Sequence, residues 1–190
     1  MITDFKDLDL SKQYTYADYL TWRFKERVEL FRGWVKKMSP APSRNHQQIV
    51  NNINVALYQF LTGTDCKVYV APFEVLLSRQ GADTVVQPDI SVICDRSKLT
   101  EQGCTGAPDL VIEVLSPGNS SREKKDKFEL YEENEVLEYW LVSPMEETIL
   151  VYDRNEKGKF IGRQPAVAGM TVDSRAVPGF SISVDKAFVE

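Results

Sequence analysis

The segment DLVIEVL, residues 109–115, predicts a strand whose two faces are both apolar. A strand that is buried on both faces lies in the middle of a sheet. Such a sheet needs a covering layer on each side, and helices are the usual covers. The segment therefore predicts a chain of the α/β class, of the mixed α+β type, with a central mixed sheet flanked by helices.

Further strands are predicted on both sides of this segment. Residues 67–77 alternate between apolar and polar side chains, and residues 85–94 are apolar around an internal proline. The remaining predicted strands are short, and they cover 138–142, 148–153, 159–163 and 180–184. A β-hairpin is predicted over 27–38, with its turn at Arg32 and Gly33, so hairpins lie at both ends of the chain.

Helices are predicted at three places. A short one covers 15–24 and begins with a capping box. From His46, apolar residues recur at intervals of three, four, seven and eight, which predicts an amphipathic helix of about four turns. A third covers 120–134 and begins with the capping-box pair Ser120 and Glu123.

The chain has 190 residues without an internal repeat, a low-complexity tract or a linker. We expect one domain over 1–190, with 1–14 as a flexible N-terminal arm. The N-terminus lacks the basic head and apolar run of a signal peptide, and no segment reaches the ~18 apolar residues that span a bilayer. We therefore expect a cytoplasmic protein that does not bind membranes.

Cysteine usage and charge exclude some classes of protein. Cys66, Cys94 and Cys104 lack the spacing of a zinc site, and their odd number favours free thiols in a reducing compartment. The net charge of −5, from 23 Lys+Arg and 28 Asp+Glu, argues against a protein that coats DNA through bulk charge. An enzyme that holds nucleic acid in a local cleft stays compatible with this charge.

Two carboxylates stand among apolar neighbours. Glu113 lies inside an apolar strand, where a charge costs several kcal/mol unless it is paired or binds a metal. Asp89 follows Pro88, which marks a strand start, a bulge or an edge because proline has no N–H for the sheet. If the strands are neighbours, Asp89, Glu113 and Glu74 can converge and bind Mg²⁺ or Mn²⁺. The alternative is that each carboxylate pairs with a nearby Lys or Arg.

Lys127 shares a helix face with Tyr131, four residues later. If this helix packs on the carboxylates, the ammonium can neutralise charge on a phosphate. The alternative is a surface lysine beside Lys124 and Lys125. His46 is the only histidine, and as a lone residue at a helix start it is expected to cap the helix or lie on the surface.

Seven segments occur in a fixed order: RVELFRGWV (27–35), Pro42 to His46, VAPFEVLL (70–77), QPDISVICD (87–95), GAPDLVIEVLSP (106–117), KFELY (127–131) and EYWLVSP (138–144). Together they resemble the Uma2 family of restriction-endonuclease-like proteins, which is similar to the PD-(D/E)XK nucleases. The resemblance implies a core of helix, three strands, helix and strand, plus the terminal hairpins.

The resemblance also implies a set of catalytic residues. Asp89 and Glu113 fall on the two acidic positions and would hold Mg²⁺ or Mn²⁺ together with the backbone carbonyl of Val114. Leu115 occupies the position of the motif's lysine. A lysine further along in Uma2-like sequences falls on Lys127, which is therefore expected to be the migrated catalytic lysine.

Other family positions imply supporting residues. Glu74 matches an acidic position and is expected as a third metal ligand. Glu29 and His46 also match family positions. Tyr131 and Trp140 are expected to support the site or to stack on a base, with core packing as the alternative.

These expectations describe a metal-dependent endonuclease that hydrolyses phosphodiester bonds in nucleic acid, with DNA preferred. The first alternative is a module of the same fold that binds nucleic acid or protein without cutting, which the acidic net charge and the displaced lysine favour. The second is a metal hydrolase of a small phosphorylated molecule. Because cutting both strands of a duplex usually needs two sites, we expect a homodimer formed through the terminal hairpins.

Overall fold

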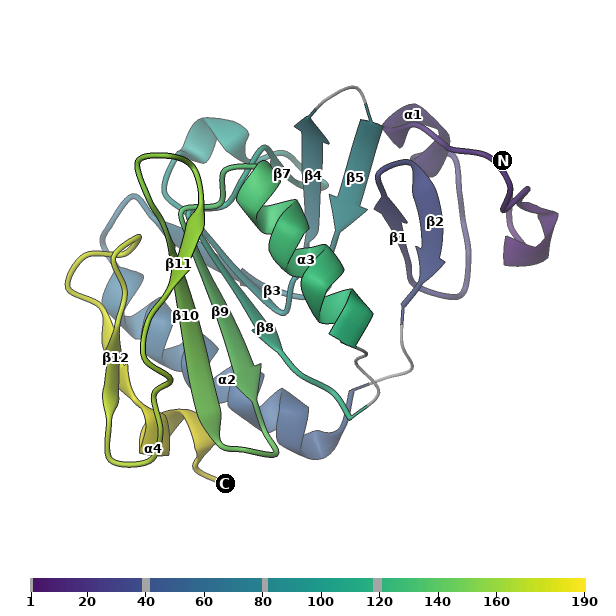
Figure 1. The fold of residues 1–190 in the computed structure, drawn as a ribbon. Helices are drawn as coiled ribbons and strands as arrows, with labels where there is room; N and C mark the ends of the chain where they lie inside the picture. Colours follow the sequence, from purple (N-terminus) through teal and green to yellow (C-terminus); the bar gives the residue numbers. More distant parts are fainter. Residues whose placement is uncertain (1, 39–41, 80–81, 118–120) are drawn as a thin grey trace.

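The computed structural model describes residues 2–38, 42–79, 82–117 and 121–190, which fold around two sheets (Figure 1). The larger sheet has the order β11 (Phe160–Gly162), β10 (Thr148–Arg154), β9 (Glu138–Ser143), β8 (Leu110–Val114), β6 (Ile90–Ile93) and β3 (Lys67–Val70). The second sheet has the order β2 (Trp34–Lys37), β1 (Val28–Phe31), β5 (Ala82–Val86), β4 (Glu74–Arg79) and β7 (Gly103–Thr105).

Strand β8 lies in the interior of the larger sheet, as its sequence predicts. Ile112 is paired with Ile90 of antiparallel β6 on one side and with Trp140 of parallel β9 on the other. The whole strand is buried. Helix α2 (Arg44–Leu61) covers one face of the sheet and helix α3 (Ser121–Glu133) the opposite face (Figure 1). The predicted mixed α+β class is therefore confirmed.

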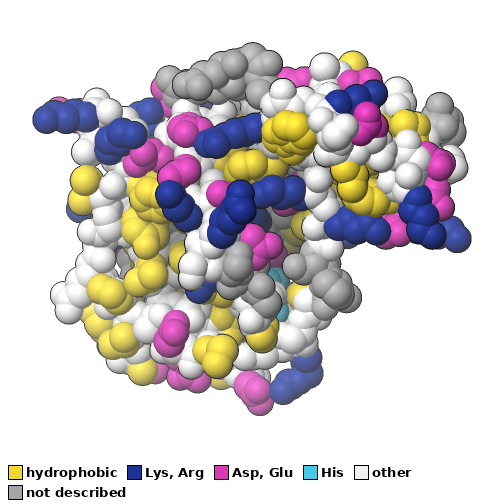
Figure 2. Space-filling model, turned by 45° about the vertical axis from the view of Figure 1, so that its right-hand side comes forward, with side chains coloured by type: hydrophobic (Ala, Val, Ile, Leu, Met, Phe, Trp, Pro, Cys, Tyr) yellow, Lys and Arg dark blue, Asp and Glu magenta, His cyan; other side chains and the backbone are white. Residues whose placement is uncertain are grey.

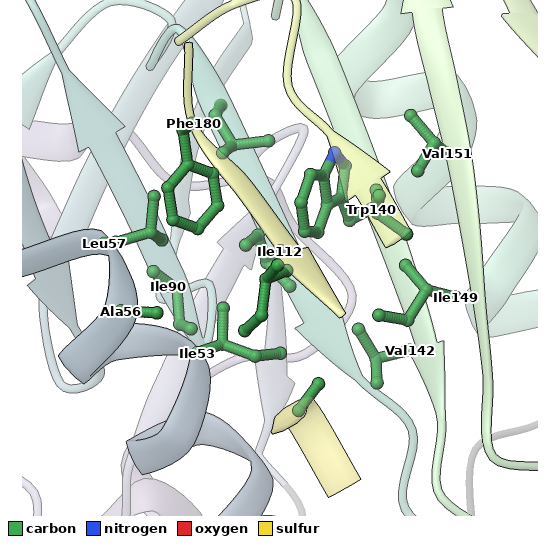
Figure 3. Packing of buried hydrophobic residues seen from close by; sticks show 14 of the residues in the cluster. Ile53, Ala56, Leu57, Ile90, Ile112, Trp140, Val142, Ile149, Val151 and Phe180 are labelled. Carbon is green, nitrogen blue, oxygen red and sulfur yellow. The ribbon is translucent and has the colours of Figure 1, made fainter. Parts of the chain in front are cut away.

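The hydrophobic core on the α2 side joins the helix to the sheet and to the C-terminal segment. Ile53 and Leu57 of α2 pack with Ile112, Trp140 and Phe180 (Figure 3). Burial of each such side chain contributes about 1.5–3 kcal/mol. Helix α2 begins after its N-cap residue, Ser43, close to the predicted start. The predicted cap of α3, Ser120, lies outside the described residues.

The predicted strands 67–77 and 85–94 are each divided between the two sheets, which corrects their prediction as continuous strands. The first one breaks at the Ala71–Pro72 peptide between β3 and β4, and the second at Pro88 between β5 and β6. Proline has no N–H to donate, so the ladder of each sheet is interrupted there. The Ala71 N–H donates to the Asp89 carbonyl at 3.1 Å. The two points at which the chain passes from one sheet to the other therefore lie side by side.

The N-terminal region packs on the second sheet. The predicted hairpin is formed by β1 and β2, and Arg32 and Gly33 take the positive φ values that its tight turn requires. Helix α1 (Tyr16–Tyr19) has the predicted capping box of Thr15 and Asp18. It ends well before residue 24, because Trp22 leaves the helix to join an aromatic cluster.

The segment that was expected to form an arm lies against this cluster. It contains the 3-10 turn η1 (Phe5–Asp7), and its Leu8 and Tyr14 are buried. A second 3-10 turn, η2 (Arg96–Lys98), precedes β7. None of the described helices is long and apolar enough to cross a membrane.

The C-terminal segment forms β12 (Thr171–Asp173), β13 (Ser181–Ser183) and α4 (Val184–Phe188), of which only β13 was predicted. It is tied to the larger sheet by Glu138, which is fully buried at the start of β9. Glu138 Oε2 accepts the Ser174 hydroxyl and the N–H groups of Arg175 and Ala176, and Oε1 accepts the indole N–H of Trp140. These donors satisfy a charge that would otherwise be costly to bury.

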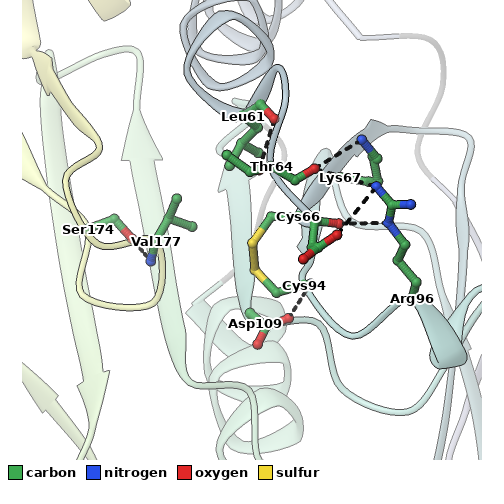
Figure 4. The surroundings of a disulfide bond; sticks show 10 residues. Leu61, Thr64, Cys66, Lys67, Cys94, Arg96, Asp109, Ser174 and Val177 are labelled. Carbon is green, nitrogen blue, oxygen red and sulfur yellow. Dashed lines mark hydrogen bonds and ion pairs between the residues drawn. A yellow bond between two sulfur atoms is a disulfide. The ribbon is translucent and has the colours of Figure 1, made fainter.

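Cys66 and Cys94 form a disulfide, which corrects the prediction of free thiols for these two residues (Figure 4). Lys67 pairs with Ile93 in the antiparallel β3–β6 ladder, so the two cysteines occupy the next opposite positions. Strand pairing brings them together across 28 residues of sequence, which their spacing alone does not reveal. Cys104 is a buried thiol. The odd number of cysteines therefore no longer argues for a reducing compartment.

Candidate active site

Asp89 and Glu113 are brought together by neighbouring strands. Ile90 of β6 is paired with Ile112 of β8, so Asp89, directly before β6, lies beside the end of β8 that carries Glu113 and Val114. Asp89 Oδ2 accepts the Val114 N–H at 2.8 Å. Both carboxylates line one pocket of about 220 Å³. The predicted adjacency of the two strands is confirmed.

Glu113 is held by two donors from α3. Its Oε1 accepts a hydrogen bond from Lys127 Nζ at 2.7 Å and another from the Tyr131 hydroxyl at 2.6 Å. Burial raises the pKa of Glu113 to about 7, against the opposing effect of Lys127. Burial also lowers the pKa of Lys127, but the Glu113 carboxylate outweighs it and the net change is upward. A charged lysine therefore balances the carboxylate inside β8.

Lys127 is the lysine of α3 that contacts Glu113. Lys127 and Tyr131 are one helical turn apart, so both reach the same carboxylate. Lys125 points elsewhere and pairs with Glu129 at 3.6 Å, while Lys124 lines the pocket. The structure thus places Lys127 where a catalytic lysine was expected.

Asp89 has a second partner in His46, which is buried near the start of α2. His46 Nε2 lies 3.2 Å from Asp89 Oδ2. Burial lowers the pKa of His46, but the hydrogen bond and charge of Asp89 outweigh it and raise the pKa. Nδ1 of His46 has no hydrogen-bond partner among the residues that the structure describes. His46 is therefore part of the site and neither a helix cap nor a surface residue, as the lone histidine had been expected to be.

The opposite wall of the pocket comes from β1 of the second sheet. Arg27, Glu29 and Phe31 line the pocket at alternate positions, while Val28 and Leu30 pack into the N-terminal cluster. Glu29 Oε1 accepts the Gln87 N–H at 3.2 Å. Arg27 donates to Gln87 Oε1 from Nε at 3.1 Å and from Nη2 at 2.6 Å.

Basic side chains surround the carboxylates at the rim. Arg27, Lys36 and Lys37 come from the N-terminal hairpin region, and Lys124 comes from α3. Lys36 also bridges the two walls, because its ammonium lies 3.1 Å from Asp126 of α3. On the face shown in Figure 2, Lys and Arg side chains gather beside Asp and Glu side chains. Neither Arg27 nor Lys36 was predicted from the sequence. Alternation with Glu29 along β1 was the available signal for Arg27.

The donor set fits a hard divalent cation. Such an ion would be held by Asp89, Glu113 and the backbone carbonyl of Val114. The contacts above use Oδ2 of Asp89 and Oε1 of Glu113, so each carboxylate retains a second oxygen, and the ammonium on Glu113 shows that this position accepts a cation. Within the described ranges, no three His, Cys, Asp or Glu side chains converge as a complete ligand set. Water would complete the shell, as is usual for Mg²⁺.

Glu74 lies apart from this set. It belongs to β4 of the second sheet, where its Oε1 accepts the Tyr19 hydroxyl at 2.9 Å. Glu74 was expected near Asp89 because residues 67–77 were predicted as one strand, and the break at Pro72 moves Glu74 into the second sheet. Trp140 packs in the core with Phe180, as its alternative interpretation stated.

Comparisons with known proteins point to one family and one fold. A family model described as "Uma2: Putative restriction endonuclease" matches residues 16–185. The "Uncharacterized protein slr1290" of Synechocystis sp. is 33% identical over 148 residues, which cover 76% of each chain. A crystal structure described as a putative nuclease belonging to DUF820, from Anabaena variabilis, superposes with a TM-score of 0.73 at 20% identity, covering 92% of this chain and 97% of that one. This likeness shows a shared fold.

Proposed function

Because the chain belongs to the Uma2 family, we propose that it is an endonuclease that hydrolyses phosphodiester bonds in nucleic acid and depends on Mg²⁺ or Mn²⁺. One observation carries the proposal. The buried carboxylate of Glu113 and the partly buried carboxylate of Asp89, from neighbouring segments of the sheet, share a pocket with a lysine that is bonded to Glu113. A scaffold has no need of the Glu113 charge inside its sheet, since such a charge is costly to bury.

Each group has a defined task in this reaction. Asp89 and Glu113 would hold a divalent cation, which would polarise the phosphate as a Lewis acid and make a bound water more acidic. Lys127 supplies positive charge where negative charge develops on the phosphate. Tyr131 holds Glu113, and the Val114 N–H and His46 hold Asp89, so that both carboxylates are oriented before substrate arrives.

DNA is the proposed substrate. The basic rim can hold backbone phosphates on either side of the carboxylates, since Arg and Lys bind phosphates regardless of base sequence. This local patch accounts for nucleic-acid binding by a chain whose net charge is −5. The description of the family as restriction endonucleases favours DNA over RNA.

A non-catalytic binding module is the second candidate, and one contact favours it. The Lys127–Glu113 ion pair at 2.7 Å already balances the buried carboxylate, so the fold is satisfied without a metal. Such a module would use the basic rim to bind nucleic acid and would leave it intact.

The deciding experiment is a cleavage assay on plasmid DNA, single-stranded DNA and RNA, with Mg²⁺, with Mn²⁺ and with EDTA. The wild type should cut DNA in the presence of metal only. Asp89→Asn and Glu113→Gln, purified identically, should lose this activity, whereas Glu129→Gln on the outside of α3 should retain it. Metal-independent cutting, or equal cutting by Glu113→Gln, would refute the proposal; binding without cutting would establish the second candidate.

A further inference from the structure

Glu29 is a buried carboxylate for which the proposed reaction gives no task. It is 8% exposed and lines the pocket from β1. Its Oε1 accepts the Gln87 N–H at 3.2 Å. A buried carboxylate is costly unless hydrogen-bond donors or a positive charge compensate it.

The partner expected from the strand register is engaged elsewhere. Lys36 is directly opposite Glu29 in the β1–β2 pairing. Its ammonium instead lies 3.1 Å from Asp126 of α3 and 4.0 Å above the ring of Phe31. Lys127 lines the same pocket as Glu29. Burial lowers the pKa of Lys127, but the charge of Glu113 and, after it, the charge of Glu29 raise it.

The two walls are held so that Glu29 faces the helix that carries Lys127. Lys36 pairs with Asp126, and Arg32 pairs with Glu133 at 2.6 Å, so two ion pairs join the hairpin to α3. Lys127 therefore shares one pocket with two carboxylates, Glu113 from β8, to which it is bonded, and Glu29 from β1.

We propose that Glu29 is a positioning residue that takes the ammonium of Lys127 when a divalent cation binds Glu113. This rests on the function proposed above. Without metal, Lys127 binds the carboxylate that the cation must share, and two positive charges on one carboxylate repel each other. Transfer to Glu29 removes the repulsion and keeps Lys127 in the pocket.

A double-mutant cycle in Mn²⁺ affinity tests this transfer. Isothermal titration calorimetry is carried out on the wild type, Glu29→Gln, Lys127→Gln and the double variant, with thermal unfolding as the check on folding. Glu29→Gln should weaken Mn²⁺ binding about tenfold, which is ordinary for coupled neighbours. In the Lys127→Gln background the same change should have less than about a twofold effect. Glu26→Gln, an exposed change just before β1, is the matched control.

The outcomes separate the two proposals. If the wild type binds no Mn²⁺, the proposed function and this inference both fail. If it binds Mn²⁺ but the two substitutions have independent effects, the inference alone fails. A crystal structure with Mn²⁺ should show Lys127 Nζ hydrogen-bonded to Glu29; Lys127 still on Glu113, or an ion bound by Glu29, would overturn the inference. If Glu29→Gln does not fold, Glu29→Asp replaces it in the cycle.

Discussion

The stability of the metal-free protein should fall as the pH rises from about 5 to 8, chiefly because of Glu113. Its pKa is about 7 in the folded protein, against an ordinary value of 4.5. Between these values the folded chain holds a proton that the unfolded chain has released, so the free energy of unfolding decreases with pH. A pKa difference of one is worth 1.36 kcal/mol, so a difference of about 2.5 lowers the free energy of unfolding by about 3 kcal/mol.

His46 adds a change of the same sign. Its pKa is raised in the folded protein, mainly through Asp89, so the stability that it contributes at low pH is also lost as pH rises through that value. The raised pKa of Lys127 acts only at much higher pH, because its ordinary value is 10.5. Between pH 5 and 8, the change in stability therefore reports on the Glu113 carboxylate and the His46 imidazole.

Urea unfolding followed by tryptophan fluorescence, in EDTA and at several pH values, measures the effect. Glu113→Gln should remove most of the decrease, whereas Glu129→Gln, on the same helix as Lys127, should keep it. At pH 8, Mn²⁺ at about 100 times its dissociation constant should restore about 2.7 kcal/mol. A wild-type stability that stays constant or rises over this range, or an equal slope in Glu113→Gln, would refute the reasoning.

Three further predictions concern other parts of the molecule. Lys127→Ala should lower the cleavage rate about a hundredfold or more, with an unchanged circular dichroism spectrum. Lys127→Arg should also cut poorly, whereas Lys125→Ala should cut normally. Normal cutting by Lys127→Ala would contradict the role proposed for Lys127. The double change Cys66→Ser and Cys94→Ser should reduce the free energy of unfolding by about 3 to 4 kcal/mol in urea, as expected for a 28-residue separation, and no difference from the wild type would contradict this. Light scattering should show a homodimer, which Trp34→Lys in the exposed β2 edge should weaken; a monomeric wild type at micromolar concentration would exclude it.

The parts of the site that sequence could predict depend on local pattern. Glu113 stands out because every neighbour in its strand is apolar, and Lys127 because Tyr131 follows at helical spacing. Asp89 is marked by the preceding proline. In each case the candidate site residue lies within a few residues of the sequence pattern that identifies it.

The parts that sequence could not predict depend on how distant segments meet. Glu74 was misplaced because Pro72 sends the chain into the second sheet, and parity does not extend across such a break. The disulfide of Cys66 and Cys94 depends on the register of β3 against β6. The position of Glu29 opposite α3 depends on ion pairs between elements about a hundred residues apart in sequence.

The burial of Glu138 has a consequence for how the chain acquires its structure during synthesis. The carboxylate enters the sheet with β9, yet three of its four donors come from residues 174–176. Until the ribosome has added those residues, closing the core around Trp140 would trap the Glu138 charge with the Trp140 indole as the one donor of the four. The α2 side of the sheet should therefore stay open in the nascent chain, and its final closure should coincide with the arrival of the segment that contains Phe180.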